Sequence, residues 1–84
     1  MSIDAARTAT LSEAVAEEIR VLLTRRRMSG RKLAQMLGVS PSWVSYRLTG
    51  QQPIDLNDLQ RIADVLGVTV IDLLPAAMVR PNNR

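Results

Sequence analysis

The chain has 84 residues, of which 46% are hydrophobic and 23% are charged, an ordinary composition for one small globular domain. It contains no histidine and no cysteine, which excludes disulfides, imidazole or thiolate metal sites, cysteine nucleophiles and Ser-His triads. We therefore expect no enzymatic activity, no catalytic residues, no metal ligands and no cofactor. Phenylalanine is absent and the two aromatic residues, Trp43 and Tyr46, are close together. Aliphatic side chains must build the core.

Neither a targeting signal nor a membrane span is visible in the sequence. The first residues, Met1 to Arg7, include an early acid and lack the apolar stretch of a secretory signal. Uninterrupted apolar runs are only a few residues long, whereas a helix needs about 20 apolar residues to cross a bilayer. The sequence predicts a soluble, cytoplasmic protein with no membrane partner and no small-molecule substrate.

The positive charge is concentrated in the middle of the chain. The net charge is +3, but seven basic residues and no acidic residue lie between Arg20 and Ile54. The remainder carries four basic and eight acidic residues. A block of one sign creates a local potential that attracts polyanions such as nucleic acids. A solvated basic helix face is the alternative interpretation.

The chain begins with a predicted loose arm at residues 1–9, followed by the first of five short helices. Thr10 and Glu13 have the spacing of a capping box, and apolar residues at helical spacing follow them. This first helix is predicted to end at about Arg27. The arginines of its last turn suit the negative end of the helix dipole, so they have a structural interpretation as well as a nucleic-acid one.

The second and third helices are short and close together. The second is predicted over residues 31–37, with Ser29 as its N-cap and Gly38 as its stop. The third is predicted over residues 41–49, with Ser40 as its N-cap and a proline at its first position, where the missing N–H costs nothing.

The last two helices carry similar start signals. Asp55 is the predicted N-cap of the fourth helix, which ends at Gly67. Thr69 and Asp72 repeat the capping-box spacing before a fifth helix predicted over residues 70–74.

Residues 30–49 have the organisation of a helix-turn-helix, in which the second helix enters the major groove of DNA. Ala34 is small where the two helices must approach, and the turn contains a glycine. The segments LAQMLGVSPSWVSYRLTG and DLQRIADVLGVTVIDLL resemble the lambda-repressor/Cro-like (XRE-type) helix-turn-helix family of bacteria and phages, over about residues 14–75. The resemblance implies an all-α, compact five-helix DNA-binding domain at residues 10–75, followed by a tail at 76–84.

Helical spacing assigns the sides of the third helix. Val44 and Leu48 point inward together, since consecutive residues are about 100° apart. The opposite side carries Ser42, Ser45, Tyr46 and Thr49. Trp43 and Arg47 lie at the boundary, so we expect Trp43 against Arg47 or a phosphate. The family usually has an apolar residue at position 47 and a polar one at 48, an order that is reversed here and that bears on the rotation of the helix.

The resemblance implies base contacts from Pro41, Ser42 and Tyr46, and the outward spacing independently selects the last two. Ser45 and Arg47 complete the set of candidate base-reading residues. Serine and tyrosine hydroxyls can bond several base edges, whereas an arginine can bind guanine bidentately. A phosphate contact, or a stem packed over the tryptophan ring, is the alternative role of Arg47.

A second set of residues is expected to contact phosphates, which position a protein on DNA without specifying sequence. The candidates are Ser29, Arg31, Lys32, Ser40, Trp43, Thr49, Gln51 and Gln52. Gly30 stands where many family members have a glutamine, so one phosphate contact of the family is expected to be missing.

The function expected from these features is sequence-specific transcription regulation, and the resemblance most suggests a repressor, of phage immunity/Cro type or bacterial XRE type. Such a protein would bind a palindromic double-stranded DNA operator in the bacterial nucleoid as a homodimer. The predicted dimer interface consists of Val70, Ile71, Leu74, Met78 and Val79. Packing of the fifth helix on the first is the alternative for these side chains.

Two other functional classes fit parts of the sequence. Ser29 and Lys32 have the spacing of a Ser-Lys nucleophile pair, but the companion motifs of such enzymes are missing. An antitoxin-like protein or another helical protein-interaction module is the stronger alternative, because a helical fold does not dictate function.

Overall fold

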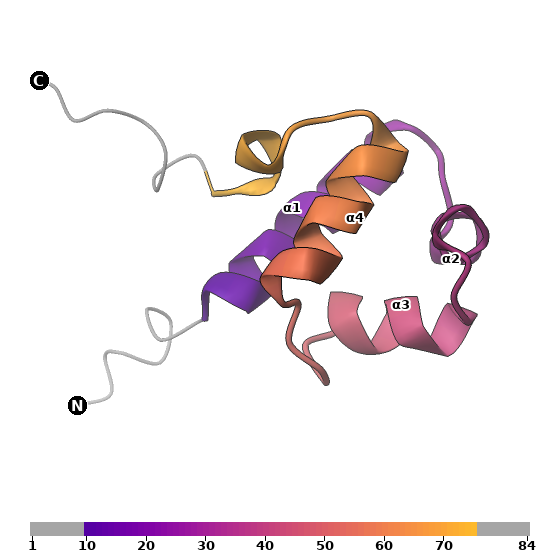
Figure 1. The fold of residues 1–84 in the computed structure, drawn as a ribbon, viewed down its shortest axis with the longest axis horizontal. Helices are drawn as coiled ribbons and strands as arrows, with labels where there is room; N and C mark the ends of the chain where they lie inside the picture. Colours follow the sequence, from indigo (N-terminus) through magenta and orange to yellow (C-terminus); the bar gives the residue numbers. More distant parts are fainter. Residues whose placement is uncertain (1–9, 76–84) are drawn as a thin grey trace, which may run out of the picture.

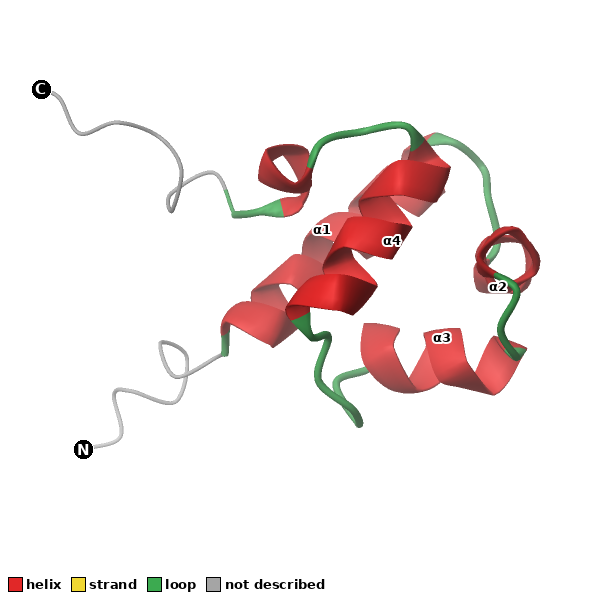
Figure 2. Ribbon diagram, viewed as in Figure 1, coloured by secondary structure: helices red, strands yellow, loops and turns green. Residues whose placement is uncertain are grey.

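The computed structural model describes residues 10–75, which form four α-helices and one 3₁₀ helix (Figure 1). These elements are α1 (Leu11–Arg25), α2 (Gly30–Leu37), α3 (Pro41–Leu48), α4 (Leu56–Leu66) and η2 (Val70–Leu73). No strand occurs in this range (Figure 2). The helix α2 packs against α3 and α4, α1 packs against α3, and η2 packs against both α1 and α4. The all-helical fold class is therefore confirmed.

The core is entirely aliphatic, as the composition requires. It consists of Val15, Ala16, Ile19, Leu23, Leu33, Ala34, Leu37, Val44, Leu59, Ile62, Ala63, Leu66 and Leu73. No polar or charged residue of the described range is buried. Trp43 is only half-buried at the edge of this core, and Tyr46 is exposed. Both aromatic residues are thus available at the surface of α3.

Side-chain caps begin every helix at the predicted residue. Thr10, Ser29, Ser40, Asp55 and Thr69 each accept a hydrogen bond from the backbone N–H three residues later. Reciprocal capping boxes are present at α1, α4 and η2. Each cap satisfies backbone N–H groups that have no partner inside the helix, so these short sequences fix where the helices start.

The first helix ends earlier than predicted. It stops at Arg25 rather than Arg27, because Arg27 has a left-handed backbone conformation with φ of 53°. The N–H of Arg27 donates to the carbonyl of Thr24 (3.1 Å) and the N–H of Met28 to that of Leu23 (2.9 Å). This is a Schellman turn, which usually contains glycine, and the absence of glycine hid it in the sequence.

The predicted fifth α-helix is wrong. Residues Val70–Leu73 form a 3₁₀ helix, with hydrogen bonds from the N–H of Asp72 to the carbonyl of Thr69 (3.0 Å) and from Leu74 to Ile71 (3.1 Å). Leu74 is extended because it precedes a proline, so too few residues remain for an α-helical turn to propagate. Smaller differences are that α2 begins at residue 30 and α3 ends at residue 48.

The predicted arm at 1–9 and tail at 76–84 lie outside the described residues, as do Met78 and Val79 of the predicted dimer interface. None of the helices within residues 10–75 is long and apolar enough to cross a membrane.

Candidate nucleic-acid interface

The rotation of α3 presents a polar, uncharged face to solvent. Val44 is buried, and Leu48 is half-buried against the core, as the helical spacing predicts. The outward positions are exposed, namely Pro41, Ser42, Ser45, Tyr46 and Thr49. The Tyr46 residue is 45% exposed, so it is accessible to a ligand. The side chains predicted to read bases, apart from Arg47, therefore share one accessible surface.

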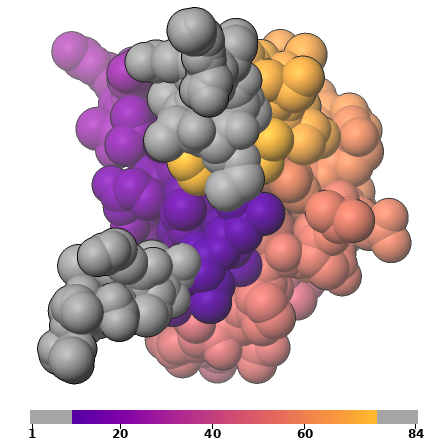
Figure 3. Space-filling model, turned by 90° about the vertical axis from the view of Figure 1, so that its left-hand side faces the viewer, coloured from indigo at the N-terminus to yellow at the C-terminus, as the bar shows by residue number. Residues whose placement is uncertain are grey.

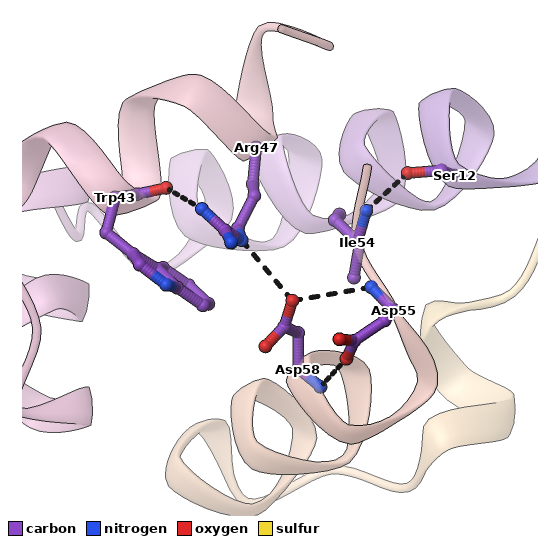
Figure 4. Close-up of polar contacts among 6 residues, drawn as sticks. All are labelled: Ser12, Trp43, Arg47, Ile54, Asp55 and Asp58. Carbon is purple, nitrogen blue, oxygen red and sulfur yellow. Dashed lines mark hydrogen bonds and ion pairs between the residues drawn. The ribbon is translucent and has the colours of Figure 1, made fainter. Parts of the chain in front are cut away.

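Arg47 lies in a different environment, between α3 and α4. Its guanidinium carbon is 3.8 Å from the centre of the Trp43 ring, which confirms the predicted contact between these residues. Its Nε donates to Asp58 Oδ2 (3.3 Å) and one terminal nitrogen donates to the Trp43 carbonyl (3.3 Å) (Figure 4). Only 19% of the Arg47 side chain is exposed. A base contact by Arg47 would require all three interactions to break.

The loop between α3 and α4 is held by hydrogen bonds at the end that precedes α4. The N–H of Ile54 donates to Ser12 Oγ on α1 (2.7 Å), and Asp58 Oδ2 also accepts from the N–H of Asp55 (3.4 Å) (Figure 4). Asp58 thus takes part in the capping of α4 and the ion pair to α3. The ion pair was not predicted from the sequence, because it joins residues 11 positions apart on different helices.

The start of α2 and the start of α3 both present hydroxyl groups. The Oγ atoms of Ser29 and Ser40 accept from the N–H groups of Lys32 (3.0 Å) and Trp43 (3.1 Å). A serine that accepts in this way keeps its O–H to donate to a phosphate oxygen. Arg31 and Lys32 are exposed beside the first of these hydroxyls. The predicted phosphate-binding residues of α2 are therefore brought together.

The predicted phosphate contacts after α3 are more constrained. The hydroxyl of Thr49 donates to the carbonyl of Ser45 (2.8 Å), and Gln51 Nε2 donates to the same hydroxyl (3.3 Å). The backbone N–H of Gln52 donates to the carbonyl of Tyr46 (3.0 Å), while its side chain is exposed. Gln52 is the candidate in this loop whose side chain is exposed and forms no hydrogen bond with the described residues.

Part of the basic block holds the fold together. The side chain of Arg20 on α1 donates to the carbonyl of Leu48, the last residue of α3, and Arg26 donates to that of Leu66, the last residue of α4. Outside the block, Arg61 of α4 donates to the carbonyl of Leu37, the last residue of α2 (2.9 Å).

These arginines occupy acceptors that a helix end leaves without partners. With Arg47 bound to Asp58, three of the seven cations of the block have structural partners. The remaining four, Arg25, Arg27, Arg31 and Lys32, are exposed on the segment from the end of α1 to the start of α2. The cationic surface offered to a polyanion is therefore smaller than the sequence suggested, and it is local to this segment.

An apolar groove lies away from this surface, where the start of α1, the start of α4 and η2 meet. Its lining is Leu11, Ser12, Val15, Ile54, Leu56, Leu59, Val70 and Leu74. Figure 3 views the side of the molecule on which the beginning of α1 and η2 are seen together. Two predicted dimer residues, Val70 and Leu74, thus line the groove, and the third described one, Ile71, is 63% exposed. Leu56, which was not predicted, is 81% exposed.

The family of the chain follows from its sequence and this arrangement of helices. A family model described as a helix-turn-helix domain matches residues 14–76. The chain belongs to the helix-turn-helix domain family. This membership confirms the resemblance drawn from the sequence, and α2 and α3 are the two helices of the helix-turn-helix. A search of curated proteins gave no match.

Solved structures with the same helix-turn-helix fold include two regulators. The hypothetical transcription factor NHTF from Neisseria is 26% identical with a TM-score of 0.72, and the match covers 79% of this chain and 76% of that one. The clp gene regulator ClgR from C. glutamicum is 26% identical with a TM-score of 0.71, and the match covers 76% and 83% of the two chains.

An enzyme shares the helix-turn-helix fold as well. The hydroxypropylphosphonic acid epoxidase from S. wedmorenis is 34% identical with a TM-score of 0.71 over 83% of this chain. The match covers 37% of the epoxidase, so the present chain spans little more than a third of its length. Within residues 10–75, no group of three or more His, Cys, Asp or Glu side chains is placed to hold a metal ion.

Proposed function

We propose that this protein is a sequence-specific, double-stranded-DNA-binding transcription regulator of the cytoplasm, and that it acts as a repressor. The observation that carries the proposal is the exposed face of α3, where Ser42, Ser45 and Tyr46 offer hydrogen-bonding groups without charge. Such side chains suit the donors and acceptors of base edges in the major groove. Helix-turn-helix membership and the two similar transcription regulators support the same function.

The surroundings of α3 support positioning on a duplex. The exposed hydroxyls and cations at the start of α2 provide phosphate contacts beside the base-reading face, which is the division of labour expected of a DNA-binding protein. Arg47 is held by Asp58 and Trp43, so it supports the orientation of α3 instead of extending into a groove. Ser42 and Tyr46 are accordingly proposed as the principal base-reading residues, with Pro41 and Ser45 beside them.

Dimerisation through the apolar groove is part of the proposal. A second copy seated there would cover Leu56 and Ile71, which are among the most exposed large apolar side chains of the described range. A two-fold dimer then matches a palindromic operator when its recognition helices lie about 34 Å apart, one turn of B-DNA. Occupation of such an operator within a promoter would repress transcription by exclusion of polymerase.

Selection of bound sites from random duplex DNA tests this function most directly. The expected result is an enriched motif with two inverted half-sites, whose binding weakens with salt. The variant Ser42→Ala should alter the preferred base at one position of each half-site, because Ser42 lies in the first turn of the recognition helix. Recovery of no enriched sequence, with no measurable affinity for duplex DNA at low salt, would refute the function.

A second candidate is a recognition domain within a longer enzyme, since the epoxidase of similar fold contains this domain as a minority of its length. The domain itself is proposed to be non-catalytic, because the chain has no histidine or cysteine and the exposed face of α3 has no nucleophile with a base beside it. The site selection separates the two candidates. A regulator enriches a DNA motif, whereas a domain of a longer enzyme that contacts only protein enriches no motif.

A further inference from the structure

Arg27 has a backbone conformation that residues other than glycine rarely adopt. Its φ is 53°, and it is the only non-glycine residue with a positive φ within residues 10–75. In this region the Cβ atom of an L-residue crowds the neighbouring carbonyl, a strain that glycine does not have. An arginine at this point therefore destabilises the folded state relative to glycine unless its side chain contributes something in return.

The same turn is built with glycine at two other places in this chain. Gly38 after α2 and Gly67 after α4 have φ of 74° and 70°. At all three turns the residue with positive φ donates to the carbonyl three positions back, and the next residue donates five positions back. Arg27 stands in the place of a glycine, in a turn that glycine would serve without strain.

The side chain of Arg27 gives the fold no visible compensation. Arg27 is exposed, and its side chain forms no hydrogen bond, ion pair or aromatic contact with residues of the described range. Arg20, Arg26, Arg47 and Arg61, in contrast, each bind a carbonyl or a carboxylate on another helix. A cation is favourable near the end of a helix dipole, but the two preceding arginines already supply it.

The position of Arg27 suggests what its charge does. It lies two residues before Ser29, the N-cap of α2, on the segment that also carries the exposed Arg25, Arg31 and Lys32. No acidic residue interrupts the sequence here. We propose that Arg27 contacts a backbone phosphate of duplex DNA, so that the phosphate-binding surface continues from α2 across the junction to the end of α1. This inference rests on the proposed DNA-binding function.

Two variants at this position test the proposal, and two measurements separate the effect of the charge from that of the backbone strain. Arg27→Gly removes both the charge and the strain, whereas Arg27→Lys retains both. Gln60→Glu lowers the net charge by the same amount as the glycine variant, at an exposed position on α4, and serves as the control. The measurements are the Tm, from circular dichroism, and the affinity for a fluorophore-labelled duplex of mixed sequence at several salt concentrations, from fluorescence anisotropy.

Arg27→Gly should stabilise the protein while weakening DNA binding. We expect its Tm to rise by roughly 2–8 °C as the strain is relieved. Its affinity should fall about fivefold to tenfold, with a salt slope smaller by about one unit, as expected when one charged group no longer binds a phosphate. Arg27→Lys should keep the slope of the wild type, and Gln60→Glu should change affinity by less than about twofold at physiological salt because its charge is screened.

Several outcomes would overturn the inference. An Arg27→Gly protein that binds as tightly as the wild type, or a control that loses as much affinity, would show that Arg27 makes no phosphate contact. A lower Tm for Arg27→Gly would show that the arginine stabilises the fold and is not retained for binding alone. A wild-type protein that binds no duplex would overturn the proposed function together with this inference, which distinguishes the two failures.

Discussion

Arg47 of α3 and Asp58 of α4 form an ion pair with 3.3 Å between Nε and Oδ2, and their side chains are only 19% and 13% exposed. A second ion pair, between Arg20 and Glu17 on α1, has side chains that are 46% and 58% exposed. The inner pair joins the recognition helix to its neighbour, whereas the outer pair lies within one helix. The first is therefore the one expected to affect how α3 is held.

Removal of the Arg47–Asp58 pair should destabilise the domain. In a double-mutant cycle with Arg47→Met and Asp58→Asn, the coupling energy should be about 1–2 kcal/mol, because both groups are largely shielded from water. Methionine was chosen at position 47 because its apolar side chain can still pack on the Trp43 ring. Denaturant unfolding of the two single variants and the double variant provides the measurement. Glu17→Gln, in the exposed pair, is the matched control and should lower the free energy of unfolding by less than about 0.5 kcal/mol. If Glu17→Gln and Asp58→Asn lowered the free energy of unfolding equally, the role given to the inner pair would be contradicted.

Tyr46→Ala should weaken operator binding without harming the fold. The residue is 45% exposed, so its loss removes little core packing. On the selected operator we expect a loss of roughly 1–3 kcal/mol, and much less on random duplex, because a base contact discriminates among sequences. Titration of both duplexes under one salt condition measures the difference. Equal losses on the two would show that Tyr46 does not read bases.

The salt dependence of binding should report on the cations at the start of α2. Replacement of both Arg31 and Lys32 by glutamine should reduce the slope of log K against log salt by about two, one unit for each phosphate that the variant no longer binds. The Tm should change little, since both residues are exposed. A wild-type slope near zero would exclude this surface as a phosphate-binding site.

Ile71→Glu should convert a dimer to a monomer. Ile71 is 63% exposed and follows Val70, which lines the apolar groove. A charge at Ile71 would be buried without a partner in the proposed interface. Sedimentation of the wild type at micromolar concentration should give a dimer, and the variant should give a monomer of similar Tm. Val21→Glu, at an apolar residue of α1 that is 37% exposed outside the groove lining, is the control and should remain dimeric. A monomeric wild type would contradict the interface.

Acid should weaken the cap of η2 through one carboxylate. The backbone N–H of Thr69, which donates to Asp72 Oδ2 (2.9 Å), and then the Thr69 side chain hold the pKa of Asp72 below its ordinary value of 3.8. Because the folded pKa is the lower one, this stabilisation is present above pH 3.8 and is lost as pH falls through the folded value.

The variant Asp72→Asn tests this dependence. It should lower the Tm at neutral pH, and this deficit should shrink as the pH falls through the folded pKa of Asp72, because the wild-type carboxylate then loses its charge as well. Thermal melts of the two proteins across this range measure the difference. A deficit that is the same at every pH would show that the charge of Asp72 is not involved.

The features that could be predicted from the sequence are those that depend on residues within a short segment of it. Caps such as Ser40 and glycine stops such as Gly67 signal helix ends within a few residues, and the spacing of Val44 and Leu48 gives the rotation of α3. These local signals were enough to locate the α-helices and the exposed residues of α3. The family resemblance added the compact helix-turn-helix domain and the expectation that α3 faces DNA.

The features that were missed depend on contacts between distant residues or on an unusual backbone. Nothing near Arg47 in the sequence indicates that it binds Asp58, and nothing near Arg61 indicates a bond to Leu37. Arg27 adopts a turn conformation for which the usual signal is glycine, so the end of α1 was placed two residues late. A charge count alone cannot distinguish cations that hold helices from those that face a ligand.

The arginine contacts to the last carbonyls of α2, α3 and α4 have a consequence for protein engineering. Each donor lies outside the helix that it holds, so a peptide cut to residues 29–50 would lack Arg20 and Arg61 together with most of the core. A grafted recognition helix would lose its orientation for the same reason. Altered DNA specificity is therefore better sought by substitution of Ser42 or Tyr46 within the intact domain than by transplantation of α3.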